Sequence, residues 1–214
     1  MTRQLFDVLD LDDGQGARQL PGVVVGIVTN NQDPDGMGRI KVKFPWLNDE
    51  DESYWTRVCT LMAGKDRGVY FLPEVGDEVL VAFEHGDRRF PYVLGSLWNG
   101  QDTPPTTNNN GKNDLRLITS RSGHVIRLND EDGKETVEII DKNNNSLLFD
   151  SSNNTIKITA QQDLTLSASQ GTITLDARTI EIKSSTQTTL QAGSTMDVKA
   201  NATMSVKGAT VNIN

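Results

Sequence analysis

Residues 156–213 repeat with a period of about eight, and this repeat constrains the fold more than any other feature of the chain. Most repeats have the form Φ-x-Φ-x-small, in which Φ is an apolar residue. The apolar positions are Ile156, Ile158, Leu164, Leu166, Ile173, Leu175, Ile180, Ile182, Leu190, Met196, Val198, Met204 and Val206, followed by Val211 and Ile213. Apolar and polar residues alternate with the period of a β-strand, so the apolar residues of one repeat share a strand face. The segment is therefore predicted to be a stack of short strands.

A single chain is poorly suited to complete such a stack. The conformational entropy lost when eight residues become ordered exceeds the free energy returned by burying two apolar side chains. Backbone hydrogen bonds close this gap only if most of the strand finds partners. Further copies of the chain would supply those partners, as in a three-sided β-prism with a small residue at each corner. We therefore predict that residues 155–214 form a homotrimeric needle whose core is made by the apolar positions from Ile156 to Val206.

The composition divides the chain into a globular and a fibrous part. Eleven of the twelve aromatic residues and all seven prolines precede residue 106. The net charge is −8, which is a poor match to nucleic acid or to an anionic membrane surface. The single cysteine, Cys59, excludes an intrachain disulfide and is predicted to be a buried thiol. Neither a signal peptide nor a transmembrane run is recognisable, so we expect synthesis and folding in a cytoplasm, followed by assembly into a larger machine.

Residues 21–105 are predicted to form a five-stranded barrel of the OB type. Runs with strand character are separated by turn residues, and the acidic run 48–52 is predicted to be a loop. Residues 106–154 are interpreted as a linker and a neck of hairpins, and residues 1–20 as an arm that docks on another protein. The predicted fold class is all-β: an OB-type barrel followed by an intertwined, triple-stranded β-helix. The five expected strands cover residues 22–30, 39–44, 54–62, 77–85 and 91–98.

Several ordered motifs of the barrel resemble one known family. They are GRIKVKFPW at 38–46, SYWTRV at 53–58, FLPEVGDEVLV at 71–81 and GSLWNG at 95–100, with TSRSGHVIRL at 119–128 in the neck. The chain is similar over residues 20–214 to the central spikes of contractile injection systems. These include the VgrG proteins of type VI secretion, the phage baseplate assembly protein V family and the spikes of extracellular tail-like particles.

The resemblance implies a structural trimer that is driven through a target envelope when a sheath contracts. Larger VgrG proteins carry a hub domain ahead of the barrel, so the resemblance implies a separate hub protein here, contacted by the N-terminal arm. Some phage spikes end in a His-x-His metal apex, which this sequence lacks. The last residues of the chain are predicted to dock a tip protein of the PAAR kind or an effector. The resemblance also implies that the spike contacts the target membrane transiently. These tip-docking residues are Val211, Asn212, Ile213 and Asn214.

No catalytic, cofactor or metal site is predicted. The two histidines, His85 and His124, have no Cys or His at ligand spacing, although three copies of one histidine could meet on a trimer axis. The basic strand face formed by Arg39, Lys41 and Lys43 could bind an oligonucleotide on an OB barrel, but a solvated or intersubunit face is favoured.

Two other functions remain as alternatives to a spike. A tail-associated, β-helical enzyme that degrades polysaccharide would need a cluster of acidic or aromatic residues, and residues 155–214 contain no aromatic residue. A fibrous adhesin would be expected to end in a globular receptor-binding head. The sequence leaves open whether the machine is a phage tail, a secretion system or a released particle, and which cell is its target.

Overall fold

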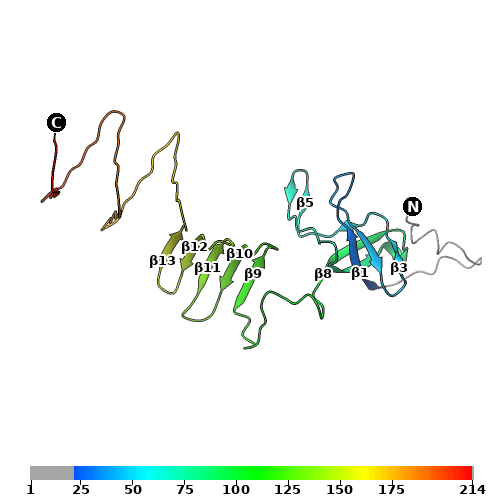
Figure 1. Ribbon diagram of the computed structural model, residues 1–214. Helices are drawn as coiled ribbons and strands as arrows, with labels where there is room; N and C mark the ends of the chain where they lie inside the picture. The colour runs from blue at the N-terminus through cyan, green and yellow to red at the C-terminus, as the bar shows by residue number, and fades with distance from the viewer. Residues whose placement is uncertain (1–21, 214) are drawn as a thin grey trace, which may run out of the picture. The chain divides into compact units, whose positions relative to one another are not determined.

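The computed structural model describes residues 22–213, without the side chains of residues 48–51, and separates into a part that ends at Thr159 and a part that begins at Ala160. Figure 1 shows a barrel and an antiparallel sheet in the first part and an extended trace in the second. The arm predicted over residues 1–20 lies outside the described residues. Within the described residues, the sole helical element is a three-residue 3-10 turn, Glu84–Gly86.

The barrel is built on a six-stranded sheet with the order β3-β2-β1-β7-β8-β4. A separate ribbon is formed by β5 and β6. The strands are β1 (Val23–Asn30), β2 (Lys41–Phe44), β3 (Asn48–Glu52), β4 (Arg57–Val58), β5 (Ala63–Gly64), β6 (Arg67–Gly68), β7 (Glu78–Phe83) and β8 (Pro91–Leu97).

Closure of the barrel depends on the segment that contains β3 and β4. Thr56 exchanges two backbone hydrogen bonds with Ile40, at 3.0 and 2.7 Å, so the segment runs antiparallel to β2. It then pairs in parallel with β8, where Arg57 lies beside Tyr92. This segment therefore links β2 to β8 and closes the sheet into a barrel. If β3 and β4 are counted as one segment, five strand segments enclose one core. The predicted all-β fold with an OB-type barrel is confirmed.

The barrel core follows the alternation seen in the sequence. Every second residue of β2 and of β7 points inward, while their neighbours are only partly buried. The inward side chains form one apolar cluster, and burial of such side chains is the dominant favourable contribution to folding. Its members are Val28, Ile40, Val42, Phe44, Val79, Val81, Phe83 and Val93.

Three expectations about the middle of the barrel are wrong. The acidic run predicted to be a loop is strand β3, because it pairs with β2 and Lys41 Nζ lies 3.2 Å from Glu52 Oε2. The strand expected over residues 54–62 pairs with β8 only at Arg57 and Val58. The chain leaves the sheet after a last bond from Cys59 N to Val93 O, so Cys59 is exposed and the predicted buried thiol is also wrong.

The second sheet is an antiparallel meander with the order β13-β12-β11-β10-β9 (Figure 1). It contains the hairpins predicted for the neck. Asn144 and Asn154 take positive φ values in its turns, and Gly123 and Gly133 do the same in the other two turns. The strands are β9 (Leu115–Thr119), β10 (Val125–Asn129), β11 (Thr136–Ile140), β12 (Ser146–Asp150) and β13 (Thr155–Thr159).

Residues 160–213 form no paired strand, and their backbone consists of extended runs separated by bends (Figure 1). Each bend begins directly after the small residue of a repeat. These residues are Ala160, Ala168, Ala177, Ser184, Ala192, Ala200 and Gly208. The single chain therefore has the turns of the predicted prism but none of its strand pairing, and the triple-stranded β-helix stays a prediction.

Candidate assembly interface

One face of the β9–β13 meander is almost entirely apolar. The strand register aligns side chains into two rows that cross all five strands on this face. Apart from Arg116 at one end, every position in both rows is apolar. The first row is Ile118, Ile126, Ile139, Leu147 and Ile158, and the second is Arg116, Leu128, Val137, Phe149 and Ile156.

This apolar face is open in the single chain. Except for Leu147, which is partly buried, its apolar side chains are between 39 and 67% exposed. A continuous apolar surface of this kind marks an interaction site, because water strongly disfavours it. The first part of the chain thus contains a preformed sheet with an uncovered apolar face.

The opposite face of the meander has a different character. Its central row contains Arg127 and Glu138, whose side chains form an ion pair at 3.4 Å. Lys157 lies at the β13 end of the same row. This face combines a cross-strand ion pair with apolar residues, so the two faces are chemically distinct.

The octad repeats present a second set of uncovered apolar residues. The predicted needle-core side chains from Leu164 to Val206 are 49 to 69% exposed, and the single chain does not bring them together. Ile156 and Ile158 are placed differently, because β13 puts both of them in the apolar rows of the meander. Of the predicted tip-docking residues, Val211, Asn212 and Ile213 are exposed, and Asn214 lies outside the described residues.

Sequence reasoning missed the apolar rows. The alternating stretches in residues 115–159 were visible, but their alignment depends on the strand register. Register is set by turn geometry, which a pattern of apolar residues alone does not determine. The signal that could have found the rows is the set of turn residues, Gly123, Gly133, Asn144 and Asn154, which locate the hairpin ends.

The basic strand face of the barrel is matched by carboxylates. Arg39 Nη2 lies 2.7 Å from Asp33 Oδ1 and 2.5 Å from Asp35 Oδ2, and Lys41 pairs with Glu52. Trp55 lies beside both cations, 5.9 Å from the Arg39 guanidinium and 5.5 Å from Lys41 Nζ. With their charges neutralised by neighbours, Arg39 and Lys41 are suited to holding the barrel together, which favours the structural interpretation over oligonucleotide binding.

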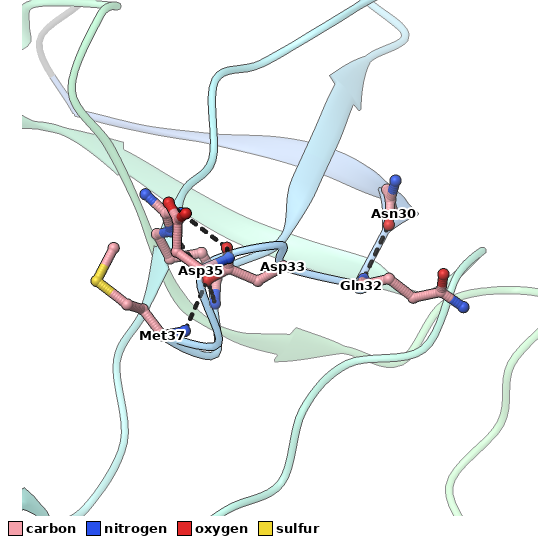
Figure 2. Close-up of polar contacts among 6 residues, drawn as sticks. Asn30, Gln32, Asp33, Asp35 and Met37 are labelled. Atoms are coloured by element: carbon pink, nitrogen blue, oxygen red, sulfur yellow. Dashed lines mark hydrogen bonds and ion pairs between the residues drawn. The ribbon is translucent and has the colours of Figure 1, made fainter.

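Asp33 organises the loop between β1 and β2 (Figure 2). Its carboxylate accepts backbone hydrogen bonds from Asp35 at 3.1 Å, Met37 at 3.0 Å and Arg39 at 3.2 Å. The Arg39 side chain and these amides hold the pKa of Asp33 well below its usual range, and Asp33 raises the pKa of Arg39 in turn. The loop has the features of a rigid structural element.

The two histidines occupy turns rather than the strands expected for them. His85 lies in the 3-10 turn with a φ of 50°, and His124 lies in the β9–β10 hairpin, where its Nδ1 accepts a bond from Lys142 N at 3.4 Å. Among residues 22–47 and 52–213, no three His, Cys, Asp or Glu side chains are grouped so that they could share a metal ion. In the same range, no helix is long and apolar enough to span a bilayer.

Together, the closed barrel, the meander with its open apolar face and the bent octad repeats define an all-β protein that exposes apolar side chains in both of its parts. Residues 24–98 match the family described as the type VI secretion system/phage-baseplate injector OB domain. The resemblance found in the sequence is confirmed: residues 24–98 match this injector OB domain, and the chain is similar to VgrG spike proteins.

Curated relatives extend the similarity beyond the barrel. The spike protein VgrG1c of Pseudomonas aeruginosa is 31% identical over 152 residues, which cover 60% of this chain and 21% of the relative. VgrG3 of Vibrio cholerae is 31% identical over 132 residues, covering 57% of this chain and 13% of the relative. The actin cross-linking toxin VgrG1 of Vibrio cholerae is 35% identical over 111 residues, covering 48% and 10%. The chain thus spans about a fifth or less of the length of these relatives.

Proposed function

We propose that this chain is the central spike of a contractile injection machine and works as a homotrimer. The observation that carries the proposal is the uncovered apolar face of the meander, continued by octad repeats, on a chain with an injector OB domain. Three copies would bury this face and the predicted needle core against one another. The spike role is also the one named for its VgrG relatives.

The proposed mechanism is mechanical. When a sheath contracts, the barrel transmits the force and the needle is driven through the target envelope. An interwound trimer suits this task because no chain leaves it without breaking contacts to both partners, and strand pairing between copies would satisfy the backbone groups of residues 160–213. No catalytic residue is required, and we infer that this chain contributes none.

The proposed partners lie at the two ends of the spike. A separate hub protein would bind residues 1–20 at the baseplate. Val211, Asn212, Ile213 and Asn214 would form the platform for a PAAR-type tip protein or an effector, and the target membrane would be contacted only during injection. Assembly would occur in the cytoplasm, within the baseplate of a phage tail or a related particle.

The decisive experiment is a mass measurement of the purified full-length chain. Native mass spectrometry and light scattering should both give three copies, stable on dilution to low micromolar concentration. A monomer or a dimer would overturn the proposal, because neither encloses a three-sided core. Enzymatic release of sugars from bacterial polysaccharide by a trimer would instead support the β-helical enzyme.

A further inference from the structure

We propose that the β5–β6 ribbon of one protomer docks into a groove beside Trp98 on the barrel of a second copy. This inference rests on the proposed assembly and adds to it a specific contact between neighbouring barrels. The ribbon and the groove belong to the same chain, and no hydrogen bond or ion pair joins them among the residues that the structure describes. Each is therefore available to another copy.

The ribbon has an apolar base and a tip, Lys65-Asp66-Arg67, whose net charge is +1. Leu61, Tyr70 and Phe71 are exposed at its base, Leu61 to 94%. Lys65 and Arg67 are exposed in its tip, and neither forms an ion pair with any residue that the structure describes. Large exposed apolar side chains combined with unpaired cations are what a docking element presents before it meets its partner.

The shape of the ribbon is fixed by its own backbone. Val69 N donates to Met62 O at 3.0 Å, and Thr60 Oγ1 donates to Val69 O at 2.5 Å. Gly68 has a φ of +155°, and a Cβ at this position would lie 2.5 Å from Met62 O. The ribbon is thus preformed, which lowers the entropic cost of docking.

The groove has the complementary chemistry. It is lined by Asp77, Glu78, Trp98 and Asp102, among others, and Trp98 is 69% exposed. None of the three carboxylates forms an ion pair with a described residue. An arginine that entered the groove would find both an aromatic face and negative charge, the two partners that a guanidinium prefers.

Asn99 holds the acidic side of the groove in place. Its Nδ2 lies 3.4 Å from both Glu78 Oε2 and Asp102 Oδ2, and its Oδ1 accepts a bond from Asp102 N at 2.7 Å. A neutral amide between two carboxylates orders them without neutralising them. The negative charge therefore stays available to a cation from outside.

The positions of ribbon and groove favour a second copy as the occupant. Val58 pairs in parallel with Val93, so the segment that leads into the ribbon runs toward the end of β8. The groove lies at that same end, because Leu97 and Trp98 follow there. Two complementary surfaces on one chain make a head-to-tail contact, which closes into a ring when the rotation between neighbouring copies allows it. A threefold ring would use every ribbon and every groove.

Cysteine cross-linking tests the contact directly. Arg67→Cys and Asp102→Cys would be combined in a Cys59→Ser background, and the full-length protein would be oxidised mildly. We expect covalent dimers and trimers on a denaturing gel, with little dimer and no trimer from either single substitution. A trimer by native mass that does not cross-link would overturn the contact and leave the ribbon for a different protein.

Charge reversal gives a second readout that does not depend on oxidation. Arg67→Glu should lower the thermal midpoint of the trimer by several degrees, and adding Asp102→Arg should restore most of the loss. Lys183→Glu, on an exposed side chain of the octad repeats, is the matched control. Equal losses in the single and double variants would overturn the contact, and a monomeric wild-type protein would overturn both this inference and the spike proposal.

Discussion

Arg39 donates two side-chain hydrogen bonds to Asp33, from Nε to Oδ2 at 2.9 Å and from Nη2 to Oδ1 at 2.7 Å. The Asp33 side chain is only 3% exposed and also accepts three backbone bonds. Asp33→Asn removes the charge and replaces one acceptor by a donor, so several of these bonds are lost together. We expect a clear fall in the thermal midpoint of the barrel, measured by circular dichroism.

Asp35→Asn is the matched control for this substitution. Asp35 also contacts Arg39, but its side chain is 65% exposed and pairs with Nη2 alone. Exposed ion pairs contribute little to stability, so the midpoint should barely change. Similar losses in both variants would show that the loop depends on Asp33 no more than on Asp35.

The barrel should lose stability in acid. Bonds from Arg39 lower the pKa of Asp33, and bonds from Arg89 lower the pKa of Asp87 to about 2. Both carboxylates have a lower pKa folded than unfolded, where the value is about 3.9. Their contribution is therefore complete above about pH 5 and is lost as the pH falls below about 4. Urea unfolding between pH 2 and pH 7 should show this, and Asp33→Asn should make the decline shallower.

The barrel could be predicted from sequence because its strands alternate cleanly between turn residues. Val79, Val81 and Phe83 indicate one buried strand face without further information. The acidic run that forms β3 could not be predicted in this way, since Asp and Glu are rare in strands and its pairing depends on β2. Cys59 was misassigned because the point at which β4 leaves the sheet depends on β8, which is distant in the sequence.

The interface was predictable only in part. The octads indicate an uncovered core because their apolar pairs recur at intervals of about eight positions, and the bends after Ala168 and Ala177 lie where small residues suggested corners. The rows of the meander depend instead on four turns acting together. A shift of one residue at the Gly123 turn would move Ile126 to the other face, and a shift at the Gly133 turn would do the same to Ile139.

The apolar face of the meander should be essential for assembly. Ile139 lies in the middle of the first row, opposite Ile126 and Leu147, and is 49% exposed. Ile139→Asp loses about 1.5 to 3 kcal/mol of burial per copy and adds a carboxylate at each interface. We expect monomers by light scattering, with the barrel still folded by circular dichroism.

Glu138→Gln is the control for the meander, because Glu138 lies on the opposite face, paired with Arg127. It should leave the trimer intact. If Ile139→Asp also assembled normally, the apolar rows would not be the interface between copies.

Tip docking should depend on the last residues of the repeat. A PAAR-type protein co-expressed with this chain is expected to co-purify with it, and deletion of residues 209–214 should abolish the interaction while the trimer persists. Truncation there removes only Val211 and Ile213 from the apolar series, so most of the predicted core remains. Undiminished co-purification after the deletion would place the docking surface elsewhere.

The needle core can be tested at one layer. Val198 is 64% exposed in the single chain and is predicted to face the trimer interior, whereas its neighbour Lys199 is predicted to face solvent. Val198→Asp would bring three unpaired carboxylates to the same level, and each costs several kcal/mol when buried. Trimers should therefore fail to form or should melt at a much lower temperature, whereas Lys199→Asp should assemble normally. Because strand side chains alternate, the reverse result would show that the opposite set of residues forms the core.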